Sequence, residues 1–264
     1  MHFEFFIGRR YLRARQKQGF ISLISVLSTA GVTVGVMALI VVIAVMAGAQ
    51  SEFRSRILGV DSHAILMRYG GEIEDYRDLI AQVQREDGVL SARPFIYTQS
   101  MLRSSSGASG AVLKGIDPPS ETEIAIEGMG EAFQKLYPPG KDKDQPGDGL
   151  PIVIGKELGR KLSVVEGDTV YLISFRGMVS PIGHVPAMKR FRVAGFFASG
   201  MYQFDEAYAF VRLADAQRIL KMGDTVSGIE IRVKDIYQAD KIAEQIKKNL
   251  GFPYWTKDWM QMNA

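Results

Sequence analysis

The sequence has no cysteine and only three histidines among its 264 residues. Without cysteine the chain has no disulfide framework and no thiolate site for zinc or an iron–sulfur cluster. The histidines share no metal-ligand spacing, and the motifs HExxH, GxSxG and GxxxxGK[ST] do not occur. The sequence therefore predicts no catalytic residue, no metal site and no cofactor. If the protein uses nucleotide energy, another chain must supply it.

Charge is absent from one long segment. No charged residue lies between Lys17 and Glu52, and Phe20–Ala49 consists almost wholly of apolar and small residues. A helix needs about 20 such residues to cross the hydrocarbon core of a membrane. A cleavable signal peptide is the alternative, because Ala47-Gly-Ala49 resembles a cleavage site, but the apolar core of a signal peptide has about 7–15 residues. We therefore expect a retained transmembrane helix at residues 19–51.

The charges that are present are unevenly distributed. Residues 1–17 carry five Lys or Arg against Glu4, a net charge of +4, which leaves −1 for the other 247 residues. A nucleic-acid partner would need basic residues spread over a folded face, so none is expected. A basic stretch before a spanning helix indicates a cytoplasmic N-terminus. We expect residues 1–18 to form a basic segment at the membrane interface, with the main domain on the outer side of the membrane. In a bacterium with two membranes, the chain would then lie in the inner membrane with its main domain in the periplasm.

Small residues mark one face of the apolar segment. Gly31 and Gly35 form a GxxxG motif, which lets a second helix approach closely. Small residues at this spacing also occur by chance in many spanning helices. Packing against a partner helix and a chance pattern both remain open on this motif alone.

The rest of the chain has the pattern of an α+β domain. A strand over Ser62–Met67 and a helix over Glu72–Glu86 are followed, near the C-terminal end, by a strand over Gly228–Val233 and a helix over Ile236–Leu250. These two βα units predict one split α/β sandwich. The residues between them, roughly 117–223, are rich in predicted strands and form an inserted subdomain.

A hairpin arm is the most informative local feature of this insertion. One predicted strand ends at Ile173, another spans Arg190–Phe197, and the link between them contains turn-forming Pro and Gly residues. That link also carries several apolar residues, namely Met178, Val179, Ile182, Val185 and Met188. An exposed apolar tip implies a partner. The alternative is that the tip folds back onto the core of the insertion.

Several motifs together support a family resemblance. They are Phe6-Ile-Gly-Arg-Arg-Tyr-Leu12, Gly35-Val-Met-Ala-Leu39, Ile57-Leu-Gly59, Gly115-Ile-Asp-Pro118, Ile152-Val-Ile-Gly-Lys-Glu-Leu158 and Ser180-Pro-Ile-Gly-His-Val-Pro186. With these motifs the chain resembles the LolC/LolE family, the permease subunits of the lipoprotein-releasing ABC transporter in the MacB-like superfamily. The resemblance implies a MacB-like periplasmic domain after the transmembrane helix. A split Porter subdomain would come from residues 52–116 and 224–264, and a Sabre subdomain from residues 117–223, with the hairpin at 175–190.

The resemblance also implies partners and site residues. The partners would be a LolD-like ATPase, a second permease subunit or a second copy of this chain, a lipoprotein cargo and a LolA-like periplasmic chaperone. Ile43 and Met46 would contact lipid or lipoprotein acyl chains. The residues that match the chaperone-binding hairpin and the basic patch below it are Met178, Val179, Pro181, Ile182, Gly183, Val185, Pro186, Lys189 and Arg190.

One departure from the family is large. Members carry about four membrane helices, whereas this sequence predicts one. That suggests a truncated product or a split subunit that another polypeptide completes. The alternative functions are a MacB-like efflux permease, an FtsX-like mechanotransmitting permease and a bitopic membrane sensor or scaffold without a transport role.

Overall fold

The computed structural model describes residues 3, 6–8, 10, 19–60, 62–118, 130–137, 149–180 and 183–262. Within these ranges, it describes the backbone alone at residues 19, 21–22, 50–60 and 175–187. The chain divides into two compact units, Met1–Ser55 and Arg56–Ala264. Each unit is described below by itself.

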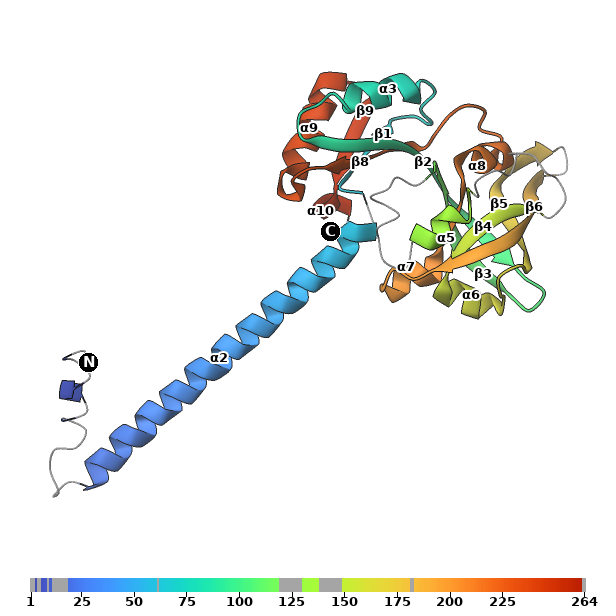
Figure 1. Ribbon diagram of the computed structural model, residues 1–264. Coiled ribbons are helices and arrows are strands. Elements are labelled where there is room, and N and C mark those ends of the chain that lie inside the picture. Colours follow the sequence, from blue (N-terminus) through green and yellow to red (C-terminus); the bar gives the residue numbers. More distant parts are fainter. Residues whose placement is uncertain are drawn as a thin grey trace. The chain divides into compact units, whose positions relative to one another are not determined.

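The apolar segment forms one continuous helix, α2, from Gly19 to Val60 (Figure 1). Its stretch Leu23–Ala49 has a mean hydropathy of 2.6 over the most apolar window, and its side chains are exposed. The hydroxyls of Thr29 and Thr33 donate to the carbonyl oxygens four residues earlier, at 2.8 and 2.7 Å. These bonds occupy polar groups that would otherwise need water. The expected helix is confirmed, and it is long and apolar enough to cross a membrane.

The second unit mixes helices and strands, as the sequence predicts. In chain order its elements are β1 (Ala64–Arg68), α3 (Tyr76–Val83), β2 (Val89–Arg103), β3 (Ala108–Ile116), α5 (Gly130–Gln134), β4 (Leu150–Gly155), α6 (Lys156–Leu162), β5 (Thr169–Ser180), β6 (Gly183–Phe197), α7 (Tyr202–Ala207), β7 (Tyr208–Arg212), α8 (Leu213–Leu220), β8 (Gly228–Val233), the 3₁₀ turn η1 (Ile236–Gln238), α9 (Ala239–Leu250), β9 (Tyr254–Asp258) and α10 (Trp259–Met262).

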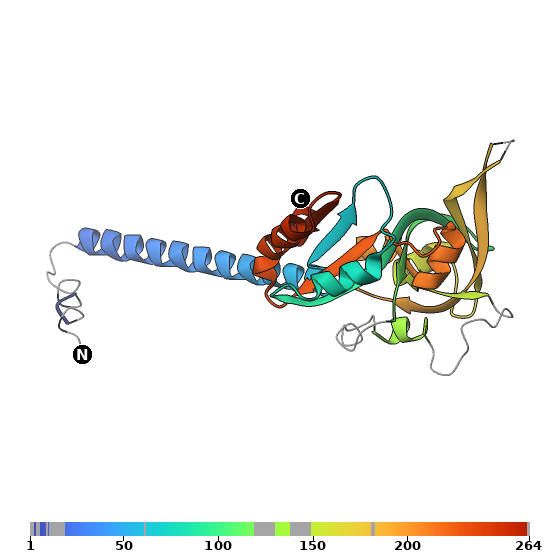
Figure 2. The same cartoon turned by 90° about the horizontal axis from the view of Figure 1, so that it is seen from above.

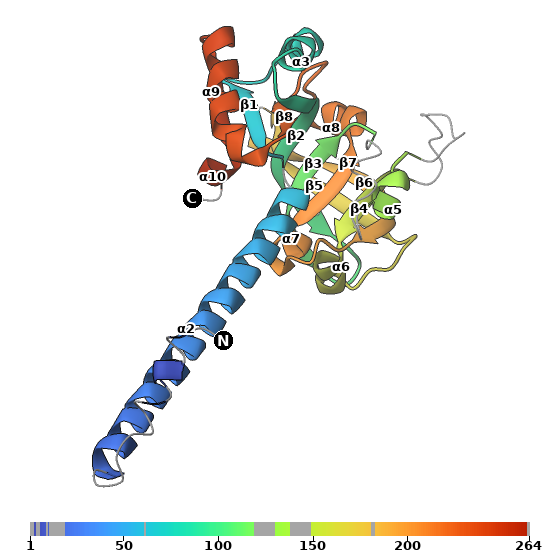
Figure 3. The ribbon, with the colours of Figure 1, turned by 60° about the vertical axis from the view of Figure 1, so that its left-hand side comes forward.

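The described strands form a single sheet that is closed at one end. The strand order is β3-β7-β4-β6-β5-β2-β8-β1-β9, and β3 also pairs with β2. The strands β2, β3, β7, β4, β6 and β5 therefore make a closed barrel (Figure 3). The first half of the long strand β2 pairs with β8, and its second half pairs with β3 and β5. Strand β2 thus joins the barrel to a smaller open sheet with β8, β1 and β9.

The core follows this layout. Helices α3 and α9 pack on the open sheet, where Leu66, Leu79 and Ile246 are buried (Figure 1). Inside the barrel the buried side chains include Leu102, Leu172 and Phe191. Both groups belong to one continuous cluster of buried residues. The barrel, the open sheet and the helices on it are therefore held together by one hydrophobic core.

Most predicted elements are confirmed, with differences at some bounds. Strand β8 has the expected bounds, and α9 begins at Ala239, after η1, rather than at Ile236. Helix α3 begins at Tyr76 rather than at Glu72. The reason is that the backbone of Ile73 pairs with that of Val226, at 2.9 and 3.0 Å, so the chain there is extended. Helix α7 has no clear sequence signal. Its Phe204 stacks on Tyr208 at 4.0 Å, within a second aromatic cluster.

The expected division of the second unit into residues 52–116, 117–223 and 224–264 stays a prediction. The boundary at 116 coincides with the end of β3, and the boundary at 223 lies shortly before β8. The sheet runs across the boundary at 116, because β2 and β3 from the first range form the barrel together with β4, β5, β6 and β7 from the second.

Candidate functional site

The hairpin predicted from the sequence is formed by β5 and β6. The two strands pair from Thr169 opposite Arg192 to Ser180 opposite Gly183. Figure 2 shows the pair projecting beyond the other strands of the unit. The link expected between Ile173 and Arg190 is therefore mostly strand in the part that the structure describes. The backbone of the second unit thus presents an arm.

An irregularity divides this arm into a base and a distal part. Ser174 pairs with Ala187 and Met178 pairs with Val185, so three residues of β5 lie opposite Pro186 alone. Proline has no N–H to donate to the ladder, and strands tolerate it mainly at edges and bulges. A bulge locally bends and twists the strand that carries it. Pro186 thus marks the point where the distal part of the arm can change direction.

The predicted docking residues occupy different parts of the arm. Met178 and Val179 lie on the distal part of β5. On β6, Val185 lies opposite Met178, and Gly183 lies opposite Ser180. Pro181 and Ile182 lie outside the described residues. The contacts of this apolar set remain a prediction.

Two predicted basic residues lie at the base of the arm. Lys189 pairs with Leu172 and Arg190 pairs with Tyr171, and both basic side chains are exposed. Successive residues of a strand point to opposite faces. The base therefore carries positive charge on both faces of the hairpin.

The predicted helix residues are solvent-exposed on α2. Ile43 and Met46 are 58% and 63% exposed. A Cβ atom built on Gly31 or Gly35 would meet nothing within 4 Å. The helix therefore has room for a close partner at both glycines. Lipid contact and helix packing remain predictions.

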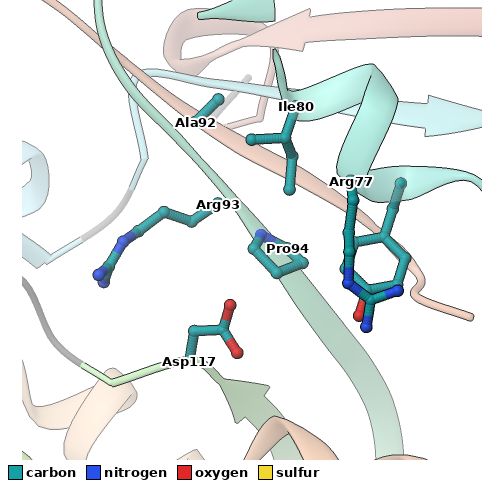
Figure 4. Close-up of a pocket in the computed structure, with 7 residues that line it drawn as sticks. Arg77, Ile80, Ala92, Arg93, Pro94 and Asp117 are labelled. Carbon is teal, nitrogen blue, oxygen red and sulfur yellow. The ribbon is translucent and has the colours of Figure 1, made fainter. Parts of the chain in front are cut away.

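The second unit also has a polar pocket of about 430 Å³ (Figure 4). It is lined by Tyr76, Arg77, Ile80, Ala92, Arg93, Pro94 and Asp117. The guanidinium of Arg77 donates to both carboxylate oxygens of Asp224, at 2.5 and 3.0 Å, and the Tyr76 hydroxyl donates to the same carboxylate at 3.1 Å. Arg93 donates to the carbonyl oxygen of Pro118 at 2.6 Å. The pocket's two cations are thus already engaged in holding chain segments together.

Asp117 is the acidic residue of this pocket. Burial raises the pKa of its carboxyl group, and the positive charges of Arg93 and Arg77 act in the opposite direction. Among the described residues that line the pocket, no nucleophile is paired with a base that could carry out acyl or phosphoryl transfer. Among the residues that the structure describes, no group of three or more His, Asp or Glu side chains could hold a metal ion. The sequence motif at Gly115–Pro118 marked this region, but the partners of Asp117 come from distant segments.

Comparisons with known proteins agree with this fold. The family model described as "MacB-like periplasmic core domain" matches residues 25–249. The LolC lipoprotein-releasing system transmembrane protein of Xylella fastidiosa (strain Temecula1) is 35% identical over 98% of this chain. The corresponding LolE protein of Haemophilus influenzae is 25% identical, also over 98% of the chain. The solved periplasmic region of MacB from Actinobacillus actinomycetemcomitans aligns with 79% of this chain and 96% of its own, at 10% identity and a TM-score of 0.46.

The alignments also show how much of each relative this chain covers. The chain spans 60% of the length of the LolC relative and 62% of the LolE relative. Within that part the similarity covers the apolar helix and nearly all of the α/β unit. The chain is similar to LolC and LolE proteins over nearly its whole length, and it belongs to the MacB-like periplasmic core domain family.

Proposed function

We propose that the chain is a transmembrane subunit of an ABC transporter that releases lipoproteins from the inner membrane to a periplasmic carrier. The observation that carries this proposal is the 35% identity to a LolC lipoprotein-releasing protein along 98% of the chain. The hairpin arm supports it, because an arm that projects from a folded unit is suited to holding a partner.

Helix α2 would anchor the subunit in the membrane. Its apolar stretch of 27 residues is about 40 Å long, at about 1.5 Å per residue, which exceeds the roughly 30 Å of a bilayer core. Its exposed apolar surface would be unfavourable in water, and lipid or partner helices would cover it. The basic N-terminal residues would remain in the cytoplasm and the α/β unit would lie in the periplasm.

The arm would hold the LolA-like carrier. Its distal part carries Met178, Val179 and Val185, and its base carries exposed Lys189 and Arg190. Apolar side chains at a narrow tip would enter an apolar pocket on the carrier, and the basic residues would attract acidic residues around that pocket. The tip residues Pro181 and Ile182 would make the central contact.

Transport would depend on other chains. The sequence has no P-loop motif, so a LolD-like subunit would hydrolyse ATP. A second permease subunit or a second copy of this chain would pack near Gly31 and Gly35. Ile43 and Met46 would face the acyl chains of the lipoprotein.

Purification of the chain from its native membranes in mild detergent tests this function. We expect an ATPase subunit and an acylated lipoprotein to copurify with it, both identified by mass spectrometry. Recovery of a periplasmic efflux adaptor in place of a lipoprotein would support the MacB-like alternative. Recovery of the chain without any ATPase would contradict a role in transport.

A further inference from the structure

The polar pocket of about 430 Å³ lies where the open sheet meets the barrel (Figure 4). Three elements line it: helix α3, which packs on the open sheet, strand β2, which belongs to both parts, and the segment directly after β3 of the barrel. Small-molecule sites typically enclose about 300–1,000 Å³ and often lie at junctions between structural parts. The pocket therefore has the size and the position of a ligand site.

Asp117 brings a carboxylate without a partner into this pocket. No described residue donates a hydrogen bond to its side chain or forms an ion pair with it. The side chain is half-buried, and this burial raises the pKa of its carboxyl group, because the charged form loses water there. Polar groups that lose water on folding are nearly always hydrogen-bonded in proteins. Asp117 therefore offers an acceptor to a cationic donor that enters the pocket.

Two guanidinium groups line the same pocket. Figure 4 shows the carboxylate of Asp117 between the side chains of Arg77 and Arg93. Arg77 is held in place, because it donates to both carboxylate oxygens of Asp224 and lies over the ring of Tyr76, 4.5 Å from its centroid. A guanidinium has five N–H donors, so these two bonds leave donors of Arg77 for a ligand. Arg77 is thus a preorganised partner for an anionic group.

The charges of the pocket restrict the kind of ligand. The arginines would attract a simple anion, but Asp117 would repel it, and a simple cation would meet the reverse. A molecule that carries both an ammonium group and an anionic group has a partner for each charge. The apolar side chains of Ile80, Ala92 and Pro94 also line the pocket, and they would contact the carbon atoms that join the two charged groups.

We propose that this pocket binds a small zwitterion, with its ammonium group on Asp117 and its carboxylate or phosphate on Arg77 and Arg93. Two sources share this chemistry: the phosphoethanolamine headgroup of a lipid and the charged ends of an amino acid or short peptide. The bound molecule would connect α3 and β2 to the end of β3, so it would stabilise the junction between the open sheet and the barrel. The inference goes beyond the proposed function and does not depend on it, because the pocket shares no residue with the arm or with α2.

Isothermal titration calorimetry of the full chain in an uncharged maltoside detergent tests the inference. The probes are phosphoethanolamine and glycylglycine, and the controls are inorganic phosphate and ethylamine, each of which carries one sign of charge. We expect at least one zwitterion to bind with a Kd of about 1 mM or below, and both controls to bind at least about ten-fold more weakly. The zwitterion that binds should also raise the Tm of the chain, because it binds the folded state alone. Binding of one probe and not the other supports the proposal and identifies the source.

Two variants test whether this pocket is the site. Asp117→Asn keeps the shape of the side chain and removes its charge, so it should weaken binding of the zwitterion about ten-fold or more. The matched control is Asp78→Asn, since Asp78 is an exposed carboxylate of α3 outside the pocket, and it should stay within about two-fold. Arg77→Gln should weaken binding as Asp117→Asn does, while Arg77→Lys, which keeps the charge, should retain part of the affinity.

Three results would overturn the proposal. The first is that neither zwitterion binds the wild type. The second is that inorganic phosphate binds as tightly as the zwitterions, which would make the pocket a simple anion site. The third is that the wild type binds a zwitterion and Asp117→Asn binds it equally well, because the ligand would then lie elsewhere on the chain. The Tm of each variant without ligand shows whether a loss of binding reflects a loss of folding, and Arg77→Lys then tests the site with the charge retained.

Discussion

The buried ion pair between Lys114 on β3 and Glu230 on β8 links the barrel to the open sheet, and its removal has a calculable cost. Nζ of Lys114 lies 2.5 Å from Oε1 of Glu230, and the two side chains are 9% and 20% exposed. Lys114→Met keeps much of the side-chain length and removes the cation. The carboxylate of Glu230 then stays in a site with little water. Removing one partner of a buried pair typically costs about 3–5 kcal/mol.

A second cation reduces this expected cost. Arg93 lies directly opposite Glu230 in the ladder between β2 and β8. It offers the carboxylate another positive charge, so we expect Lys114→Met to lower the free energy of unfolding by about 3 kcal/mol, at the lower end of that range. Urea unfolding of the full chain in detergent, followed by the fluorescence of Trp255 and Trp259, measures the change. Both tryptophans lie in or beside β9, at the edge of the open sheet.

The double variant Lys114→Met/Glu230→Leu is the decisive control. It removes both charges and leaves apolar side chains, a replacement that is often near neutral. We therefore expect the double variant to be more stable than Lys114→Met alone. The reasoning is refuted if Lys114→Met costs less than about 1 kcal/mol, or if the double variant loses as much as the two single variants combined.

Two further predictions concern stability. Gly115→Ala should lower the free energy of unfolding by about 1–3 kcal/mol, because the new Cβ would lie 2.6 Å from Cβ of Ala216. The control Gly110→Ala meets open space and should change it by no more than about 0.5 kcal/mol. Equal effects of the two variants in urea unfolding would contradict the packing argument. Burial, with a smaller effect of Arg232, lowers the pKa of the His63 imidazole from its usual 6.5, and the N–H of Val233 donates to its Nδ1 at 3.0 Å. As the pH falls, the unfolded chain therefore takes up this proton before the folded chain does. The stability is fully present above about pH 6.5 and falls below it by at most about 1.4 kcal/mol per pH unit, until the folded protein is protonated as well. Because solvent screens this half-buried group, the total loss is small. His63→Gln should flatten the pH dependence of urea unfolding, and an unchanged slope would assign that dependence to other groups.

Local sequence patterns predict much of this fold. The alternation of buried and exposed residues in β8 and the helical spacing in α9 are strong, because each element packs one face on the core. The apolar helix follows from composition alone. The start of α3 is not predictable in this way, because the backbone of Ile73 pairs with Val226, a residue more than 150 positions away. Local propensity carries no information on such a partner.

The candidate site is predictable only in part, for the same reason. The prolines and apolar residues of the arm stand close together in the sequence, so the hairpin could be expected from the chain alone. The surface at its base comes from three strands, where Met101 pairs with Ile173 and Ile173 pairs with Met188, so its make-up depends on the register between β2 and β5. A shift of one residue would turn Met101 into the barrel. The sequence signal for this surface is the alternation in Met101-Leu-Arg103 and Tyr171-Leu-Ile173. It predicts that each central leucine is buried and that the flanking residues face outward.

Photocrosslinking at the tip of the arm tests the central claim most directly. A photoreactive amino acid at position 182 of the membrane-embedded chain should give an adduct that contains the LolA-like carrier. The same amino acid at Val165, which is 65% exposed on another loop, should give none. Absence of the carrier from the adducts at position 182, or equal adducts at both positions, would contradict the claim that this chain delivers lipoproteins through its arm.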